Sequence, residues 1–407
     1  MSLATTSLKD MCELVVDCPH FTPEWTTTGY IVIRNQNIRN GRLDLSNPSY
    51  TNKQDFDRRN RRAKPQLGDV IFTREAPMGE VCIVPEGLEC CIGQRQVLLR
   101  PKKGIDSRYF FYALRSSFVR HQIFWNEGTG STVSNVRIPV LEVLKIPRLG
   151  AAEKKIGDLL GAIDDKIDLN YRVNETLEAM ARTIFNDWFV DFGPTRAKME
   201  GRAPYLAPEL WALFSDRLDP KGKPAEWLTT RWGEIATLVY GKGLTGYEGE
   251  AGPYAVFGTN GQIGFYSRPL CEHPGIIVGR KGAYRGVHYC ERPFFVIDTA
   301  FYVEPRNHPM ELRWAYYELL RQRINDMDSG SAIPSTSREE VYSLAVVFPP
   351  FEIQQSFVKL LRPSWDVQEH NLAEARTLAA LRDALLPKLM SGEIRIRDAE
   401  RVLEAAL

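Results

Sequence analysis

The chain has 407 residues, of which 43% are hydrophobic, and its 52 Lys and Arg nearly balance its 51 Asp and Glu. This globular composition excludes a mainly disordered, collagenous or purely coiled-coil protein, and the length predicts two or three domains. No apolar run approaches the ~18 residues of a membrane span, and residues 1–12 lack the apolar core of a signal peptide, so we expect no membrane partner.

Residues 1–150 are expected to form a first domain of mixed sheet and helix. Short β-branched and aromatic runs, such as 30–33 and 81–84, alternate with Gly, Pro and Asn turns, and the aromatic run 108–114 predicts one helix. The block carries 21 Lys and Arg against 15 Asp and Glu, a local charge of +6. This excess weakly favours a polyanionic partner.

Three features of this block are candidates for contacting DNA. The densest basic cluster, between a turn and the strand at Val70, consists of Arg58, Arg59, Arg61, Arg62 and Lys64. Arg74 follows that strand at a turn of small residues, which let a backbone approach a phosphate closely. The backbone of the Gly-Ser loop at Thr129, Gly130 and Ser131 suits phosphate oxygens. A mobile charged loop and an ordinary tight turn are the plain alternatives for the cluster and the Gly-Ser loop.

Residues 151–193 predict a long coiled-coil helix. Its two seams recur every seven residues and contain Ile156, Leu160, Ile163, Ile167, Asn170, Leu177 and Ile184. A polar Asn170 on a seam lowers stability but fixes the register of the helix pair; a partly exposed side chain near a frayed seam is the alternative.

Residues 194–226 are rich in Pro and charge and read as a connector with a short helix near 209–214. Residues 227–350 repeat the strand-rich pattern, and their candidate DNA contacts are Arg280, Lys281, Arg285, Ser329, Gly330 and Ser331. Residues 351–394 predict the second long helix, with seam residues Asn371, Leu378 and Leu385. We expect Pro363 to interrupt its first turns and residues 395–407 to form a tail.

The two halves repeat each other at an offset near 200. Segment 128–133 corresponds to 328–333, segment 70–74 corresponds to 276–280, and Leu169-Asn170 matches His370-Asn371. An ordered series of matches at a steady offset favours a duplicated domain. We therefore predict an α/β (α+β) chain of two similar domains joined by a pair of antiparallel coiled-coil helices, with a pseudo-twofold internal repeat.

No catalytic constellation is evident. There is no G-x-x-x-x-G-K-[ST] phosphate loop, no G-x-G-x-x-G turn that follows a strand and opens a helix, and no H-E-x-x-H helix. The seven cysteines form no C-x-x-C pair and the six histidines are scattered, so we expect free thiols in a reducing cytosol and no metal site. Glu153 and Lys155 match half of a metal-dependent nuclease motif, but at a helix start they favour a solvated face.

Four segments carry a family resemblance. Residues 68–81, and 279–287 followed by 297–300, resemble the target-recognition domains of the specificity subunits of type I restriction-modification enzymes. The helix ends at 188–192 and 386–394 resemble that family's two conserved regions. The resemblance spans nearly the whole chain, although the P-P-x-x-E-Q entry to each long helix is degraded.

The resemblance implies a non-catalytic subunit whose two recognition domains each read one half of a bipartite, asymmetric site in double-stranded DNA. The paired helices would set the unspecified gap and dock two methyltransferase subunits, joined by motor-nuclease subunits. Those partners are then expected to bind S-adenosylmethionine, ATP and Mg²⁺. The complex is expected in the cytoplasm of a bacterium or archaeon.

Two other classes of function stay open at the level of residues. One is a metal-dependent nuclease that uses Glu153 and Lys155. The other is an assembly scaffold whose sheets bind protein rather than DNA.

Overall fold

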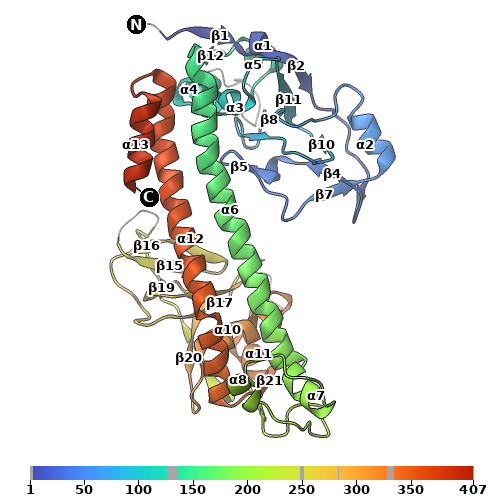
Figure 1. Cartoon of the computed structure of the whole chain (residues 1–407), viewed down its shortest axis with the longest axis vertical. Coiled ribbons are helices and arrows are strands. Elements are labelled where there is room, and N and C mark those ends of the chain that lie inside the picture. The colour runs from blue at the N-terminus through green and yellow to red at the C-terminus, as the bar shows by residue number, and fades with distance from the viewer. Residues whose placement is uncertain (1–2, 126–134, 248–251, 283, 328–333, 407) are drawn as a thin grey trace. The chain divides into compact units, whose positions relative to one another are not determined.

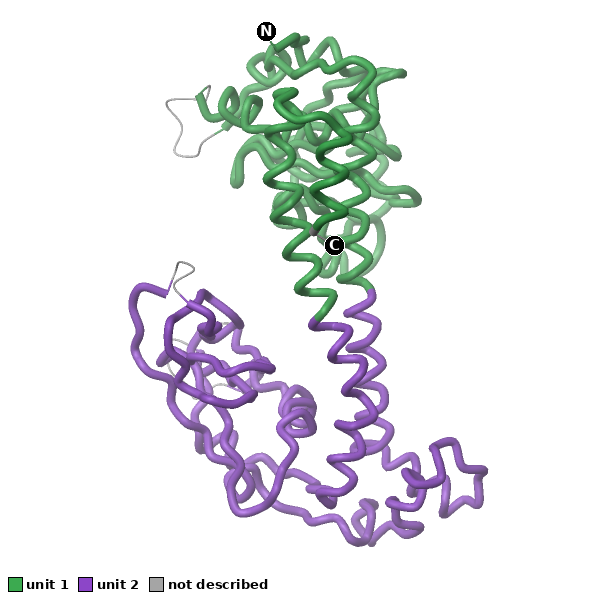
Figure 2. Tube along the Cα trace, turned by 60° about the vertical axis from the view of Figure 1, so that its left-hand side comes forward, with its two compact units in different colours: residues 1–172, 370–407 green, residues 173–369 purple. Residues whose placement is uncertain are grey.

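The computed structural model describes residues 3–125, 135–247, 252–282, 284–327 and 334–406. The chain divides into two compact units, residues 1–172 with 370–407 (unit 1) and residues 173–369 (unit 2), as coloured in Figure 2. Each unit contains sheet and helix (Figure 1). Each of the two long helices contributes residues to both units. The predicted mixed α/β class is confirmed.

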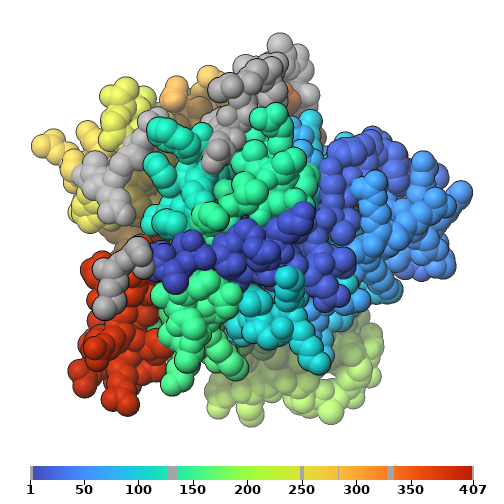
Figure 3. All heavy atoms as spheres, turned by 90° about the horizontal axis from the view of Figure 1, so that it is seen from above, coloured from blue at the N-terminus to red at the C-terminus, as the bar shows by residue number. Residues whose placement is uncertain are grey.

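Unit 1 is built on two four-stranded sheets. The first has the order β2 (Cys12–Asp17), β11 (Gln96–Pro101), β8 (Val70–Thr73), β9 (Val81–Ile83), all antiparallel. The second has the order β10 (Cys90–Ile92), β4 (Tyr30–Ile33), β7 (Ser49–Thr51), β3 (Trp25–Thr26), with β10 parallel to β4. The N-terminal β1 (Thr5–Ser7) pairs with β12 (Lys145–Pro147), where the blue segment of Figure 3 lies against the green one.

Unit 2 repeats this topology. Its antiparallel sheet has the order β14 (Ala236–Tyr240), β20 (Ala300–Pro305), β17 (Gly275–Gly279), β18 (Val287–Cys290). Its second sheet has the order β16 (Gly261–Tyr266), β15 (Tyr254–Gly258), β19 (Phe294–Val296), with β19 parallel to β15. Strand β13 (Leu228–Arg231) pairs with β21 (Ala345–Phe348) as β1 pairs with β12. The predicted internal repeat is therefore present at the level of strand order.

The short elements follow the same repeat. Helices α1 (Leu8–Met11), α3 (Ser107–Arg115) and α5 (Ile138–Val143) have counterparts in chain order at α9 (Trp232–Ile235), α10 (Leu312–Arg321) and α11 (Arg338–Ser343). The remaining short elements are α2 (Lys53–Arg59), α4 (Ser117–Trp125), α7 (Gly193–Met199), α8 (Pro208–Ala212), α13 (Ile396–Ala406), the strand pair β5 (Ile38–Arg39) and β6 (Arg42–Leu43), and turns of 3-10 or π helix at 35–37, 150–152, 186–190 and 324–326.

The two long helices, α6 (Glu153–Phe185) and α12 (Phe351–Ser391), pair antiparallel within each unit. In unit 1 the predicted seam residues Ile156, Leu160, Ile163, Ile167, Leu378 and Leu385 are buried in one cluster. Asn170, 3% exposed, donates through Nδ2 to the Glu374 carboxylate at 2.7 Å and to the Asn371 carbonyl at 3.4 Å. In unit 2, Asn174 Nδ2 donates to the Gln368 carbonyl at 3.1 Å. These bonds fix one register of the pair, as predicted for Asn170.

Most of the seam in unit 1 faces the chain's own core. The seam weakens along α6, where Leu177 and Ile184 are only half-buried. The predicted seam role is confirmed for the buried residues, and a docking role for the long helices stays a prediction.

Two expectations about the ends of the helices are wrong. Pro363 does not interrupt α12, which runs from Phe351 to Ser391; the neighbouring Phe357, Leu361 and Trp365 are buried in the core of unit 2, and this packing outweighs the missing N–H of one proline. The C-terminal residues are not a loose tail, because α13 packs Ala399 and Leu403 into the core of unit 1.

A buried polar network joins the two long helices to the first domain. Asp164 on α6 accepts a hydrogen bond from Tyr112 Oη at 2.5 Å and pairs with Arg382 Nη1 of α12 at 2.5 Å. Burial, followed by the Asp164 charge, raises the pKa of Tyr112, so this hydroxyl stays protonated and donates. Among the described residues, no helix combines the length and the low polarity that crossing a membrane requires.

All seven cysteines are free thiols, as predicted, and six of them are buried. Burial raises the pKa of Cys12 and Cys90 to about 12 and that of Cys91 to about 11, whereas the same thiols titrate near 9.0 in an unfolded chain. Between these values only the unfolded state loses protons, so the stability is complete below pH 9.0 and falls as the pH rises toward about 12.

We therefore expect the urea midpoint of unfolding to drop as the pH rises from about 9 toward about 11. The drop should be smaller in a Cys90→Ala, Cys91→Ala double variant. An equal drop in this variant would assign the alkaline instability to other groups.

Candidate nucleic-acid interface

The predicted basic cluster begins in the last turn of α2. Arg58, Arg61 and Arg62 are exposed, and the Arg58 guanidinium lies 4.1 Å from the centre of the Phe21 ring. Lys64 is also exposed and pairs with Glu89 through Nζ and Oε1 at 2.5 Å. Four of the five predicted cations therefore face solvent, where they are available to phosphates.

Arg59 departs from the prediction. It is 3% exposed, and its guanidinium donates to the carbonyl oxygens of Ile92 at 3.0 Å and Phe21 at 2.7 Å. Burial lowers the pKa of this group, which is nevertheless held in place by backbone acceptors. The prediction that Arg59 contacts DNA is therefore wrong. Its side chain stabilises the fold by binding the Ile92 and Phe21 carbonyls.

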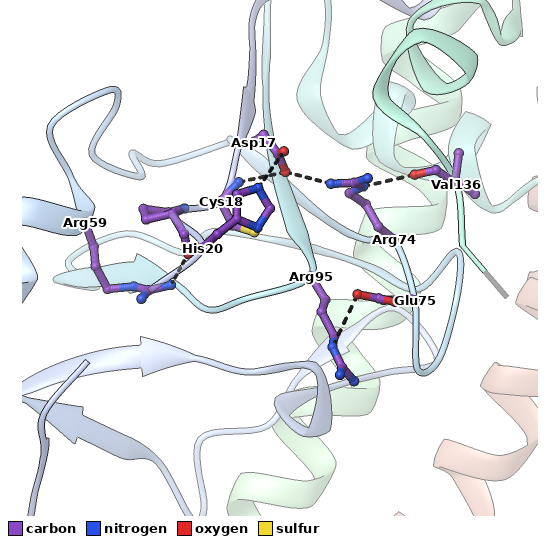
Figure 4. Close-up of polar contacts among 9 residues, drawn as sticks. Asp17, Cys18, His20, Arg59, Arg74, Glu75, Arg95 and Val136 are labelled. Carbon is purple, nitrogen blue, oxygen red and sulfur yellow. Dashed lines mark hydrogen bonds and ion pairs between the residues drawn. The ribbon is translucent and has the colours of Figure 1, made fainter. Parts of the chain in front are cut away.

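Arg74 lies directly after β8 and organises the turn that follows. Its Nη1 pairs with Asp17 Oδ1 at 2.9 Å and its Nε donates to the Val136 carbonyl at 3.0 Å, as drawn in Figure 4. The Val136 N–H in turn donates to the Arg74 carbonyl at 3.0 Å. These bonds use the Nε and Nη1 donors and tie Arg74 to the turn, while its side chain stays 19% exposed.

Unit 2 has the same arrangement at Arg280, directly after β17. The Thr336 N–H donates to the Arg280 carbonyl at 2.9 Å, which corresponds to the Val136–Arg74 bond of unit 1. The Arg280 guanidinium lies 4.8 Å from the Tyr240 ring centre and donates to the Asp298 carbonyl at 3.1 Å. Lys281 is exposed beside it. Both units thus present a basic turn at the same place in the fold.

Arg285 is a second correction. It is 4% exposed and donates to Thr336 Oγ1 at 2.9 Å, to the Gly282 carbonyl at 2.8 Å, and to the carbonyls of Asn325 and Met327. With its donors used inside unit 2, it joins the β17–β18 turn to the segment before α11 and does not reach solvent.

Six predicted phosphate-binding residues lie outside the residues that the structure describes. They are Thr129, Gly130, Ser131, Ser329, Gly330 and Ser331.

The structure also brings together a polar concavity in unit 1 that sequence reasoning missed. A cavity of about 450 Å³ is lined by residues that include Trp25, Arg34, Gln36, Gln94 and Arg95. Arg34 lies 5.2 Å from the Trp25 ring centre, and Arg95, 53% exposed at its side chain, pairs with Glu75 at 3.3 Å (Figure 4). Arg and Gln are the side chains that make paired hydrogen bonds to guanine and adenine edges.

The backbone conformation at Gly93 and Arg95 shapes this concavity. Gly93 packs so closely on β4 that a Cβ atom would lie 2.5 Å from the Ile33 carbonyl oxygen. Arg95 has a φ of +68°, an uncommon conformation for a residue with a side chain, and such positions cluster at functional sites. The detectable signal was the polar Gln94-Arg95 pair after a Gly between two apolar strands.

Glu153 is 7% exposed and therefore not on the solvated helix face that we expected. Its Oε1 accepts hydrogen bonds from the Leu149 and Gly150 N–H groups at 2.9 and 3.1 Å and from Arg148 Nε at 2.7 Å. These bonds satisfy the N-terminal turn of α6, so the nuclease alternative is not supported.

Comparisons with known proteins agree with the fold. A family model described as the type I restriction modification DNA specificity domain matches residues 3–179. The chain is 25% identical over 362 residues to the MjaIX specificity subunit of Methanocaldococcus jannaschii, covering 81% of this chain and 78% of that protein. It is 50% identical over 149 residues to the HindI specificity subunit of Haemophilus influenzae, covering 35% of this chain and 32% of that protein.

A solved structure supports the same fold. The crystal structure of the type I restriction-modification S subunit from M. genitalium superposes with a TM-score of 0.56 at 19% identity, covering 95% of this chain and 96% of that one. The matched domain and the relatives make this chain similar to type I restriction-modification specificity subunits, and the solved S subunit has the same fold.

Proposed function

We propose that the chain is the specificity subunit of a type I restriction-modification complex and that its two units are its two DNA readers, each addressing one half of a bipartite, asymmetric site. The observation that carries the proposal is the repeated sheet with a basic turn after the same strand, Arg74 after β8 and Arg280 after β17. Because the residues around these two turns differ, the two half-sites differ in sequence.

The chain itself makes and breaks no bonds in this proposal. Two methyltransferase subunits and the motor-nuclease subunits supply the chemistry and bind S-adenosylmethionine, ATP and Mg²⁺, in the cytoplasm of a bacterium or archaeon. The structural use of the Glu153 carboxylate supports this division of labour, since this group was the strongest catalytic candidate in the chain.

The long helices set the gap between the half-sites. Helices α6 and α12 each supply residues to both units, and the cross-helix bonds of Asn170 and Asn174 hold them in a single register. Buried polar groups that fix the register prevent the two helices from sliding along each other, which would change the spacing between the half-sites.

The salt dependence of DNA binding tests the proposal. For the complex with its methyltransferase subunits, an Arg61→Ala, Arg62→Ala variant should lower the slope of log K against log salt by about 0.9 for each phosphate that the variant no longer neutralises. Arg376→Ala, which removes an exposed cation from α12, is the control and should leave the slope unchanged. Binding of duplex DNA that is insensitive to salt in all three proteins would contradict a DNA-reading role.

A further inference from the structure

Three side chains of unit 2 have the composition of a transition-metal site. Cys271 and His273 lie between β16 and β17, Glu304 lies on β20, and their ligand atoms are all within 4.8 Å of one another. The Cys271 Sγ is 3.7 Å from His273 Nε2, which is 3.1 Å from Glu304 Oε1. Sulfur, nitrogen and oxygen ligands at the corners of one Zn²⁺ tetrahedron are about 3.3–3.6 Å apart, given the usual Zn–ligand distances.

The hydrogen bonds of His273 leave its Nε2 lone pair available to a metal ion. Its Nδ1 is 2.8 Å from the Pro274 carbonyl oxygen, which only accepts, so Nδ1 carries the proton. The lone pair of Nε2 then faces the Glu304 carboxylate, and two acceptors in contact require a proton or a metal ion between them. Metal-binding histidines usually donate their other ring nitrogen to a carbonyl or carboxylate in this way.

The surroundings favour a cation. Cys271 is 3% exposed and is held by paired backbone bonds to Phe294, each 3.0 Å long. Among the described residues, the only ion pair of Glu304 is with His273, so no arginine or lysine neutralises this carboxylate.

A similar set in unit 1 provides the contrast. Asp17, Cys18 and His20 are also close together, but the Arg74 guanidinium pairs with Asp17 at 2.9 Å (Figure 4). This arginine supplies the positive charge that a metal would bring, and it would repel an added ion. The two sets therefore differ in whether a cation is already present.

We propose that Cys271, His273 and Glu304 bind one Zn²⁺ ion, with water as the fourth ligand, and that the ion ties the segment before β17 to strand β20. On binding, the Cys271 thiol releases its proton to solvent and the thiolate bonds to the metal. His273 and Glu304, whose side chains are 44% and 35% exposed, give the ion a path from solvent. The site is independent of the DNA-reading role.

Cobalt substitution tests the site in the full-length chain. The metal-free protein titrated with Co²⁺ should bind one equivalent, with tetrahedral visible bands and thiolate-to-cobalt charge-transfer absorption, and Zn²⁺ should displace it. Glu304→Gln keeps the size and polarity of a partly exposed side chain and should weaken Co²⁺ binding at least about tenfold. Cys271→Ser should abolish the charge-transfer band.

Cys290→Ser and Cys18→Ser are the matched controls, since each removes a thiol outside the site and should leave the bands unchanged. Circular dichroism and the urea midpoint of metal-free Glu304→Gln should equal those of the parent, which separates impaired ligation from misfolding. Absence of a charge-transfer band in the parent protein, or a band that survives Cys271→Ser, would overturn the proposal and leave a His273–Glu304 ion pair.

Discussion

Replacing Arg95 with alanine is expected to weaken binding to the cognate DNA site by about 5- to 150-fold, the effect of removing one good bidentate interaction with a base, worth about 1–3 kcal/mol. Arg95 combines an exposed guanidinium, a φ of +68° and a place in the concavity that Gln36 and Gln94 also line. The measurement is the affinity of the methyltransferase-bound complex for its own site, and the adenines it modifies genome-wide should show relaxed preference in one half-site only.

Arg95→Lys separates the two ways in which this residue can act. Lysine retains the charge but not the planar fork, so it should restore affinity if Arg95 contacts only a phosphate and should restore little if Arg95 reads a base. Lys103→Ala, an exposed cation on another loop of unit 1, is the control. Equal reductions in affinity for Arg95→Ala and Lys103→Ala would contradict a specific role for the concavity.

Replacing Phe357 with alanine should cost about 3–5 kcal/mol of stability in unit 2, as large-to-small changes at buried aromatic residues do. Phe357 is fully buried at 0% exposure. Its ring contacts the rings of Phe185, Trp188, Phe189, Tyr317 and Trp365. The change would therefore loosen α12 from both α6 and α10 within unit 2.

Urea unfolding followed by tryptophan fluorescence measures this destabilisation, because Trp188 and Trp365 both lie in the affected cluster. Leu360 lies on the same helix but is 42% exposed. The control variant Leu360→Ala should therefore change the free energy of unfolding by less than about 1 kcal/mol. Similar destabilisation by the two variants would show that the aromatic cluster does not hold the end of α12.

The sequence alone determined the architecture. The seven-residue spacing of Ile156, Ile163 and Asn170 predicted the helix seam, and the offset near 200 predicted two domains of one topology. These features were accessible because helix periodicity and internal repeats are properties of local order along the chain. The family resemblance rested on equally local motifs.

Only the tertiary structure shows which of the basic side chains are exposed to solvent. Arg58 and Arg59 are neighbours in sequence, yet Arg58 is exposed while Arg59 is closed off by the carbonyls of Phe21 and Ile92. Burial of a guanidinium depends on acceptors far along the chain, which spacing cannot reveal. The same reason explains why Glu304 was not linked to Cys271 and His273: strand pairing, not sequence distance, brings a β20 side chain to the segment before β17.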